Sequence, residues 1–380
     1  MRFGLIGPVY PHRGGIAHHT ALLAGKLSAR HEVLVVSFRR QYPSILYPGA
    51  TDRDPSRSKL RVPAELIIDP LNPFTWGRAA ARLRAWGPDL VAVQWWVTYW
   101  AAPFAWLAAT LRRSGIQTIF IVHNTLPHEE RIWDRALARL ALNKGSGFIV
   151  HNPKEADRLR ELLPQADIVT TPLPDFDLIG DERLDRLEAV RRLGIEPEPP
   201  LMLFFGFVRP YKGLACLLEA MHILISGGES VNLMVAGEFW ESRRSNEAMV
   251  NHLGLARHVT LVDRYIPNEE INLYFSAADA LVAPHLAGTQ SGAAAIALGY
   301  RLPLILTERI AGGLSDEDRA SAIIVEPGSP SALAAGIHRW LKFGPRSVNP
   351  APHHDDHWSS MLDILQARAA LGHRKAEGAG

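Results

Sequence analysis

The feature that most constrains this chain is the regular alternation of short apolar runs with longer amphipathic stretches. Buried parallel sheets covered by helices produce this alternation, because each strand is buried on both faces and each helix on one. The first half of the chain is therefore expected to form one doubly wound α/β sheet. Strands are predicted at residues 3–6, 33–38, 90–94, 118–122 and 147–151, and helices at 16–29, 75–85, 101–113 and 130–143.

The same alternation restarts after a segment that is bounded by prolines. A charged helical stretch at 181–192 lies between Pro172 and Pro197, and such segments are typical domain boundaries. The chain of 380 residues is also longer than one core usually supports. We therefore expect an N-terminal domain over 1–172, a linker over 173–199, a C-terminal domain over 200–348, and a closing helix and tail over 349–380. Strands of the second domain are predicted at 201–205, 232–236, 259–262, 280–283, 304–307 and 322–325.

Charge and cysteine content limit the classes of function. A net charge of +2 is too balanced for a dedicated nucleic-acid binder, which neutralises many phosphates. Cys216 is the single cysteine, so an internal disulfide is excluded and a reducing compartment, the cytoplasm, is expected. The N-terminus reads as a first strand rather than a signal peptide, and no apolar run reaches membrane-spanning length. Contact with a membrane is expected only at its surface.

The segment LMLFFGFVRPYKG, residues 201–213, is the most informative one for chemistry. An apolar strand runs into Gly206 and then into a loop that contains Arg209, Lys212 and Gly213, directly before a helix. Glycine allows close backbone approach, and a helix N-terminus with two cations favours an anion such as a diphosphate. The alternative is that the two charges are solvated and that the glycine only shapes a turn.

A second glycine-containing loop follows the first predicted strand. Gly14 and Gly15 precede a helix, so backbone amides there are able to face a phosphate or a sugar. An ordinary turn between strand and helix is the alternative. The spacing of the glycines does not match G-x-G-x-x-G, which disfavours a nicotinamide-dependent dehydrogenase.

The third segment is IFIVHNTLPHEE, residues 119–130, in which a buried strand ends at His123 and Asn124. Polar residues just past the carboxyl end of a parallel strand are well placed for a ligand, although a structural histidine is the alternative. His128, Glu129 and Glu130 either cap the next helix or line an acceptor site. Glu129 is a candidate acceptor contact.

These three segments, in this order, resemble the motifs of family 4 glycosyltransferases of the GT-B type, and the resemblance extends over essentially the whole chain. It implies two Rossmann-like doubly wound domains and a C-terminal crossover helix, with Trp358 as its anchor. It also implies retaining transfer from a nucleotide diphosphate sugar without a metal or cofactor. Arg209 and Lys212 would hold the diphosphate, the Gly14–Gly15 loop would face donor and acceptor, and His123 would bond a hydroxyl of the donor sugar.

One motif departs from the family. Family 4 usually has two glutamates separated by seven residues in the donor site, and residues 284–303 place Gly288 and Ile296 at those positions. Isoleucine cannot accept hydrogen bonds from a ribose, so nucleotide binding is expected to be rearranged. Gly237 follows another strand and is expected to flank the donor. The loop residues expected to meet the sugar hydroxyls are Thr289, Gln290, Ser291 and Gly292.

Several alternatives remain open at this stage. The missing glutamates favour, as an alternative, a catalytically degenerate GT-B protein that acts as a binding or scaffolding subunit. The aromatic run at 94–106 is a sugar-facing or lipid-facing wall, or else interdomain packing. The loop at 39–61 contacts anionic lipid, or is simply solvated. The run of histidines and aspartates at 353–357 fits the start of a helix better than a metal site. The expected acceptor is a saccharide, a lipid-linked or a small molecule, as in polysaccharide biosynthesis.

Overall fold

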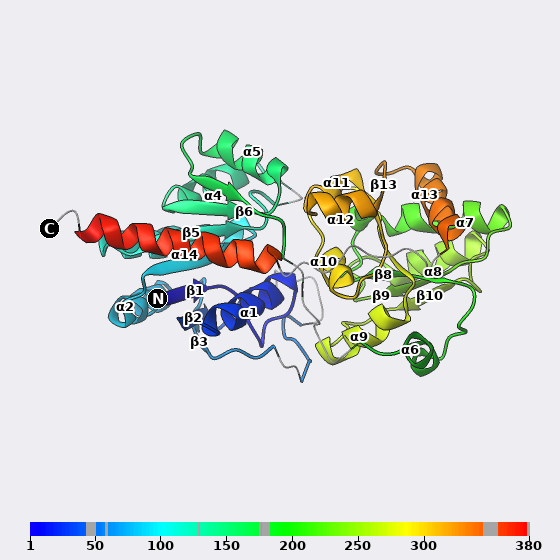
Figure 1. Ribbon diagram of the computed structural model, residues 1–380, viewed down its shortest axis with the longest axis horizontal. Coiled ribbons are helices and arrows are strands. Elements are labelled where there is room, and N and C mark those ends of the chain that lie inside the picture. Colours follow the sequence, from blue (N-terminus) through cyan, green and yellow to red (C-terminus); the bar gives the residue numbers. More distant parts are fainter. Residues whose placement is uncertain are drawn as a thin grey trace. The chain divides into compact units, whose positions relative to one another are not determined.

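The structure is a computed structural model that describes residues 1–42, 51–57, 60–127, 130–174, 176, 183–344 and 356–377. It divides into two compact units, each of which contains one parallel sheet (Figure 1). Unit 1 consists of Met1–Pro55, Leu60–Pro174 and Asp355–Gly380, and unit 2 of Ser56–Lys59 and Asp175–His354. The main division after Pro174 lies two residues beyond the boundary predicted at 172.

The sheet of unit 1 is a seven-stranded parallel sheet in the order β3-β2-β1-β4-β5-β6-β7. The order reverses between β1 and β4, which defines the switch point at which open α/β sheets bind ligands. The strands are β1 (Arg2–Ile6), β2 (Glu32–Phe38), β3 (Ala64–Ile68), β4 (Leu90–Trp95), β5 (Gln117–Val122), β6 (Gly147–Val150) and β7 (Ile168–Thr170).

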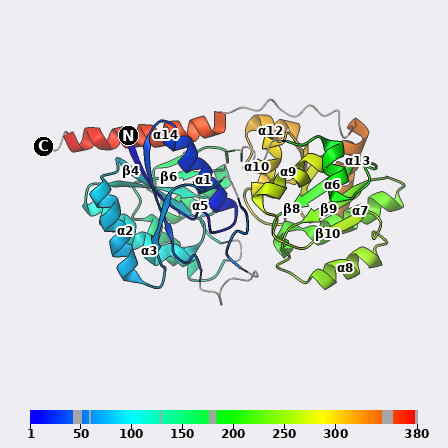
Figure 2. The same ribbon diagram turned by 90° about the horizontal axis from the view of Figure 1, so that it is seen from below.

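Helices cover both faces of this sheet, as the all-apolar strands require. Two hydrophobic clusters result: one joins α2, α3, α4 and α5 to one face, and the other joins α1 and α14 to the opposite face (Figure 2). Among the described residues, no helix is both long enough and apolar enough to cross a membrane. The helices of unit 1 are α1 (Gly15–Ser28), the short 3-10 helix η2 (Thr98–Trp100), α2 (Pro73–Trp86), α3 (Ala101–Arg113), α4 (Asp134–Leu142), α5 (Pro153–Leu162) and α14 (Asp356–Glu377).

The C-terminal helix α14 returns to unit 1, which confirms the predicted crossover helix. Trp358 is 3% exposed and packs in one cluster with Phe3 of β1 and Leu23 of α1. Replacing a buried tryptophan by alanine lowers stability by about 3–5 kcal/mol. Trp358 therefore anchors the helix as expected.

The aromatic run after β4 is mostly core, so the prediction of a sugar-facing or lipid-facing wall is wrong for its central members. Trp95, Trp100 and Phe104 are fully buried within unit 1, and Trp100 stacks on Phe104 with ring centroids 5.5 Å apart. These rings pack against helices and strands of their own unit, so the alternative of interdomain packing is also wrong for them. Trp96 and Tyr99 are half-buried, and Trp106 is 41% exposed.

Unit 2 contains a six-stranded parallel sheet in the order β10-β9-β8-β11-β12-β13, so its switch point lies between β8 and β11. Its strands are β8 (Leu201–Phe205), β9 (Asn232–Ala236), β10 (Val259–Val262), β11 (Ala280–Ala283), β12 (Leu304–Thr307) and β13 (Ile323–Val325). Its helices are α6 (Arg186–Leu193), the 3-10 helix η3 (Pro210–Lys212), α7 (Leu214–Ser226), α8 (Arg243–His252), α9 (Asn268–Ala277), α10 (Gly292–Gly299), α11 (Glu308–Ala311), α12 (Asp316–Ser321) and α13 (Pro330–Phe343).

The predicted fold class is confirmed, and most predicted strands coincide with those of the structure to within one residue. Two strands, β3 and β7, were not predicted. Both are edge strands that are short and partly exposed, so their apolar signal is weak. Helix α4 begins at Asp134 rather than at 130, because the Asp134 carboxylate accepts a hydrogen bond from the amide of Arg131 at 2.7 Å and another from the Thr98 hydroxyl.

Candidate functional site

The loops that follow β8, β9 and β11 meet at the switch point of unit 2. They contain the residues predicted for the donor, and neighbouring parallel strands end at the same edge of the sheet. Sequence positions that are more than 80 residues apart are therefore brought to one edge. The predicted residues that lie on these loops are Gly206, Arg209 and Lys212 after β8, Gly237 after β9, and Thr289, Gln290, Ser291 and Gly292 after β11.

Close backbone contacts fix two of these loops and explain their glycines. A Cβ atom on Gly237 would lie 2.0 Å from the carbonyl oxygen of Gly206, and Gly206 itself has a positive φ of 96°. The amide of Gly206 donates to the carbonyl of Ala236 at 2.9 Å, which extends the pairing of β8 with β9 into the loops. Larger residues at either glycine would push these loops apart.

Gly213 holds the Arg209–Lys212 loop against the loop after β11. It has a φ of 76°, and a Cβ atom there would lie 2.1 Å from the carbonyl oxygen of Pro284. The amide of Leu286 also donates to the carbonyl of Tyr211 at 2.7 Å. The two loops of the switch point therefore pack as one body.

Lys212 is a cation in an unusual position. Its ammonium lies over Gly206, since a Cβ atom on that glycine would be 3.1 Å from Nζ, and no carboxylate of the described chain lies within 4.0 Å of it. Burial, with a smaller effect from the charge of Arg209, lowers the pKa of Lys212 to about 8. An anion bound beside Gly206 would favour the charged ammonium and reverse this shift.

Arg209 is placed by aromatic rings. Its guanidinium lies 5.3 Å from the ring centroid of Tyr211 and 5.4 Å from that of Trp240, a geometry that favours a cation. Tyr211 in turn meets the imidazole of His285 edge to face, with centroids 5.9 Å apart. Tyr211, Trp240 and His285 were not predicted as site residues, although His285 lies two residues after β11, close to the strand end as His123 is after β5.

The loop before α10 is polar but is partly used for structure. The hydroxyl of Ser291 accepts a hydrogen bond from the amide of Ala294 at 3.3 Å and caps the helix, and Thr289 is 2% exposed. Ile296, at the position where the second family glutamate was expected, is 5% exposed and faces the core. The amide groups of this helix N-terminus remain the natural hydrogen-bond donors of the loop.

In unit 1 the loop after β1 contains the predicted Gly14 and Gly15. Gly14 has a φ of 112° and its carbonyl accepts from the amide of Ala17 at 3.0 Å, so it starts α1 in a conformation that favours glycine. A Cβ atom on Gly15 would meet no atom within 4 Å, so open space adjoins this helix start.

His123, after β5, belongs to a buried polar cluster rather than standing alone. Its Nε2 lies 2.6 Å from Oε1 of Gln94, and the Gln94 amide nitrogen lies 3.2 Å from Nδ1 of His19. His151 completes the cluster, and its Nδ1 donates to the carbonyl of Thr171 at 3.3 Å. All three histidines are 2% exposed or less.

Burial keeps these imidazoles neutral. It lowers the pKa of His123 well below its ordinary value near 6.5, and the two neighbouring histidines lower it further. Burial and His151 lower the pKa of His19 in the same way, and burial brings the pKa of His151 to about 4. At neutral pH the cluster therefore contains hydrogen-bond donors and acceptors but no positive charge.

Only His123 of this cluster was predicted from the sequence. His19, Gln94 and His151 were missed as site residues, although Gln94 and His151 also lie at the carboxyl ends of strands, the rule that selected His123. Asn124 is partly exposed directly after His123. Glu129 and the run at 353–355 lie outside the described residues, so their predicted roles stay predictions.

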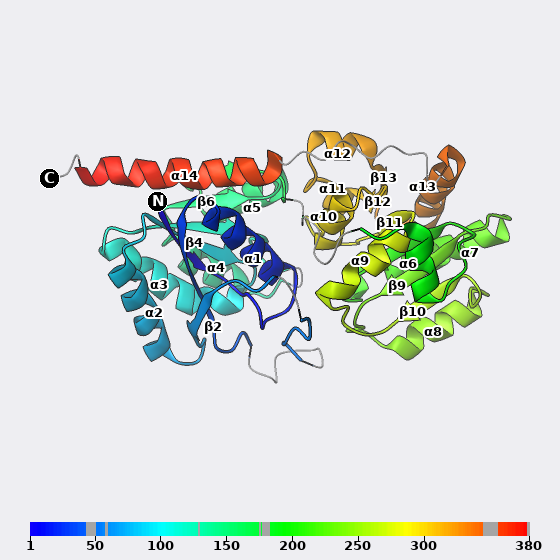
Figure 3. The same ribbon diagram turned by 60° about the horizontal axis from the view of Figure 1, so that its bottom comes forward.

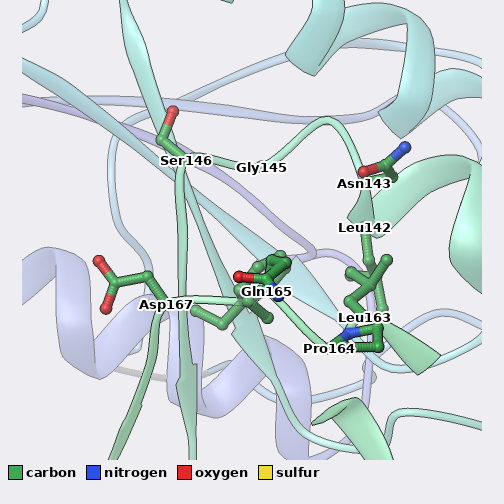
Figure 4. Close-up of a pocket in the computed structure, with 10 residues that line it drawn as sticks. Leu142, Asn143, Gly145, Ser146, Leu163, Pro164, Gln165 and Asp167 are labelled. Atoms are coloured by element: carbon green, nitrogen blue, oxygen red, sulfur yellow. The ribbon is translucent and has the colours of Figure 1, made fainter. Parts of the chain in front are cut away.

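A pocket of about 310 Å³ lies where strands β6 and β7 of the unit 1 sheet begin, at the end opposite to their carboxyl ends (Figure 4). Its lining comes from the loops that precede β6 and β7, including Asn143, Ser146 and Gln165. None of the predicted site residues lines it, and the amino ends of parallel strands are not where such sheets bind ligands. The pocket therefore does not compete with the strand carboxyl ends as a candidate site.

Comparisons with known proteins agree with this geometry. Residues 199–342 match the family model described as "Glycosyl transferases group 1", and residues 13–173 match "Glycosyltransferase Family 4". Two doubly wound units with candidate sites at their switch points define the class as a GT-B fold. The chain belongs to the group 1 and family 4 glycosyltransferases and is an enzyme of that kind.

Relatives and solved structures extend over most of the chain. A D-inositol 3-phosphate glycosyltransferase of Thermobifida fusca is 25% identical over 93% of this chain and 88% of its own length. An enzyme of the same name from Segniliparus rotundus is 29% identical over 55% of this chain, but this match spans only 48% of that protein. A 2-deoxystreptamine glucosyltransferase of Streptomyces kanamyceticus is 25% identical over 71% of this chain and 70% of its own length.

Among solved structures, Anabaena HepE in complex with UDP superposes with a TM-score of 0.70 at 14% identity over 99% of this chain and 100% of that chain. Sucrose-phosphate synthase from Thermosynechococcus elongatus gives 0.65 at 18% identity over 100% of both chains. At these identities the likeness shows the fold.

Replacing Gly213 by alanine tests whether the two loops of unit 2 pack as one body. We expect Gly213→Ala to lower the free energy of unfolding by about 1–2 kcal/mol, because a positive φ strains a residue that has a Cβ atom. The contact of that Cβ atom with Pro284 should lower it by at least about 2 kcal/mol more. Gly228→Ala is the matched control, because Gly228 has a φ of 87° but no atom within 4 Å of the added Cβ. Urea unfolding followed by circular dichroism measures both. Equal losses in the two variants would contradict the close packing.

Proposed function

We propose that this glycosyltransferase takes its sugar from a nucleotide diphosphate sugar that unit 2 binds at its switch point. The observation that supports this most is the ammonium of Lys212, which lies over Gly206 with no described carboxylate within 4.0 Å. Together with Arg209 it offers two positive charges to a diphosphate. The printed ligand of Anabaena HepE, UDP, is of this chemical class.

The remaining donor contacts follow from the loops. We propose that Gly206 and Gly237 allow the diphosphate to approach the backbone, and that the amides of residues 289–292 bond the sugar hydroxyls. Ser291 contributes through its backbone, because its hydroxyl caps α10. With Ile296 in the core, the ribose is held by groups other than the usual glutamate.

In unit 1 we propose that the Gly14–Gly15 helix start faces the phosphates and the acceptor, with Asn124 and Glu129 on the acceptor side. His123 is proposed to accept a hydrogen bond from a hydroxyl of the transferred sugar. It is neutral at physiological pH, so it positions this hydroxyl without adding charge.

We propose a retaining transfer that needs no metal or cofactor. The bond between the anomeric carbon and the diphosphate oxygen breaks, and the acceptor oxygen forms the new bond on the same face. The departing diphosphate takes the proton of the acceptor hydroxyl, while Arg209 and Lys212 stabilise its growing charge. Inversion at the anomeric carbon of the product, or loss of turnover in a chelator, would disprove this scheme.

The acceptor is proposed to be a hydroxyl of a saccharide, of a lipid-linked sugar or of a small molecule. The names of the relatives, an inositol phosphate and a 2-deoxystreptamine enzyme, belong to the small-molecule class. The lipid-linked class is supported by an exposed surface of unit 1, described below as the aromatic face.

A titration with nucleotides tests the donor site. We expect one of UDP, GDP and ADP to raise the melting temperature of the wild type, because a ligand at one hundred times its Kd stabilises by about 2.7 kcal/mol. The Arg209→Ala, Lys212→Ala double variant should lose about 3–6 kcal/mol of binding, from two charged hydrogen bonds. Calorimetry would show this as a Kd raised more than a hundredfold.

The matched control for that titration is Arg243→Ala, Arg244→Ala, which removes two exposed cations of α8 in the same unit. It should bind nucleotide like the wild type. No stabilisation of the wild type by any of the three nucleotides would contradict a diphosphate site in unit 2.

The titration of Lys212 gives the donor site a pH dependence. Its pKa of about 8 means that the ammonium is charged below pH 8 and becomes neutral above it. Diphosphate favours the ammonium, so binding above pH 8 must take up a proton and the Kd should rise about fivefold between pH 8 and 9. In Lys212→Arg the guanidinium stays charged and the Kd should stay flat. Parallel curves for the two proteins would contradict a role of Lys212 in binding.

The aromatic face of unit 1 consists of apolar side chains on α2 and α3, in the segment directly before α4 and near the end of α4, which are neighbouring elements in the unit (Figure 3). Each is at least 41% exposed, and three exposed arginines lie in the same segment of sequence as Ile132, Trp133 and Leu140. We propose that it rests on anionic lipid at the inner face of the membrane, with the enzyme on the cytoplasmic side. Its members are Phe74 (87% exposed), Trp106 (41%), Ile132 (95%), Trp133 (51%) and Leu140 (48%), with Arg131, Arg135 and Arg139.

Sedimentation with vesicles tests this surface. The wild type should pellet with phosphatidylglycerol vesicles and not with phosphatidylcholine vesicles, and Ile132→Ser, Trp133→Ser should lose most of the pelleted fraction. Phe343→Ser, which changes an exposed aromatic residue of unit 2, is the control. Equal pelleting of all three proteins would exclude the aromatic face as the contact.

A further inference from the structure

Arg209 and Lys212 are two cations that lie close together at the switch point of unit 2. Burial lowers the pKa of Lys212 to about 8, and the charge of Arg209 adds to this shift, so the two groups repel each other. An arginine side chain has several rotatable bonds, and turning into solvent would reduce that repulsion. The contacts that keep the guanidinium of Arg209 near Lys212 therefore matter for the proposed diphosphate site.

Two aromatic rings contact the guanidinium of Arg209. Its central carbon is 5.3 Å from the ring centroid of Tyr211 and 5.4 Å from that of Trp240, and both distances are within the range of a cation-π contact. Tyr211 lies in the same loop as Arg209, whereas Trp240 lies in the loop after β9. Of the two rings, Trp240 is therefore the one that connects Arg209 to another strand of the sheet.

The backbone of Trp240 is fixed by a continuation of the pairing of β8 with β9. The amide of Val208 donates to the carbonyl of Glu238, and the amide of Trp240 donates to the carbonyl of Val208, each at 2.9 Å. Phe239 forms a parallel bridge with Val208, and its amide donates to the carboxylate of Asp263 at 2.9 Å. Val208 is fully buried, so the core of unit 2 anchors this short ladder.

The indole ring of Trp240 is held by a row of rings. It packs on the ring of Phe207 with centroids 4.5 Å apart and an angle of 33° between the planes. Phe207 in turn lies 6.4 Å from the ring of Tyr265, which follows β10. The three rings come from the ends of three neighbouring strands, β8, β9 and β10. The row ends at the guanidinium of Arg209.

We propose that Trp240 is a positioning residue that holds the guanidinium of Arg209 near Lys212 before a diphosphate binds. An arginine loses rotamer freedom when it is fixed, and one that is fixed in advance adds less to the cost of binding. A preorganised cation also stabilises growing charge on a leaving group without first having to move. The inference rests on the proposed diphosphate site, and it adds a residue that acts through Arg209 rather than on the ligand.

NMR of protein labelled with ¹⁵N-arginine tests the position of Arg209 without a ligand. The ring currents of nearby aromatic side chains displace the Nε–Hε signal of a guanidinium, and Arg209→Lys assigns this signal by its loss. We expect the signal to move toward the ordinary arginine position in Trp240→Leu and to stay displaced in Trp240→Phe. The signal of Arg186, whose guanidinium is 2.7 Å from the Asp279 carboxylate at the amino end of β11, should not move and reports an intact fold.

Calorimetry with inorganic pyrophosphate, a diphosphate without base or sugar, tests the consequence for binding. We expect Trp240→Leu to raise the Kd about five- to thirtyfold, the range for a partly to fully desolvated cation-π contact. Trp240→Phe keeps an aromatic ring and should raise the Kd less than about threefold. In an Arg209→Ala background, Trp240→Leu should raise it less than about twofold, because the group that it positions is gone.

This double-mutant cycle separates positioning from a structural role. If Trp240 only stabilised the loop, Trp240→Leu would weaken binding by the same factor with and without Arg209, and that outcome would overturn the proposal. An Arg209 signal that does not move in Trp240→Leu would also overturn it, because other contacts would then hold the guanidinium.

The same measurements separate this inference from the proposed function. If Arg209→Ala weakens pyrophosphate binding and Trp240→Leu does not, only the role of Trp240 is wrong. If Arg209→Ala binds pyrophosphate as the wild type does, the proposed diphosphate site is wrong and the inference fails with it.

Discussion

Parallel pairing of β8 with both β9 and β11 is the constraint on which the site of unit 2 depends. It brings three strand ends to one edge, and the loops that leave them have to pass within van der Waals contact of each other. Glycine at 206, 213 and 237 makes this possible, because any Cβ atom at 213 or 237 would overlap a neighbouring carbonyl. The position of Lys212 follows from that packing rather than from a partner of its own.

A charged group held in this way makes the fold less stable than it would be without the charge. The lowered pKa of Lys212 expresses that cost, since burial disfavours the ammonium and Arg209 adds repulsion. An anionic ligand removes both penalties at once, so part of the cost is recovered on binding. This agrees with the proposed role of Lys212 and Arg209, which is to stabilise a diphosphate leaving group as its charge grows during transfer.

The buried histidine cluster of unit 1, in contrast, is uncharged. Its histidines His19, His123 and His151 are buried and neutral, and Gln94 contacts two of them, so they form hydrogen bonds without net charge. This difference agrees with the proposed roles, in which unit 2 binds the charged diphosphate of the donor and unit 1 orients hydroxyl groups. On its outer surface, the aromatic face combines apolar rings and arginines that a buried core would not tolerate.

The sequence by itself determined the two doubly wound domains, the crossover helix and the loops after β1, β5, β8, β9 and β11, because apolar periodicity and glycine positions are local signals. It did not reveal β3 and β7, whose edge positions dilute that signal, or that the tryptophans after β4 are core. Only the tertiary structure decided that His19, Gln94 and His151 join His123, and that Tyr211 and Trp240 hold Arg209. These groups come from strands and helices far apart in the chain, and what brings them together is the order of strands in each sheet, which no local pattern encodes.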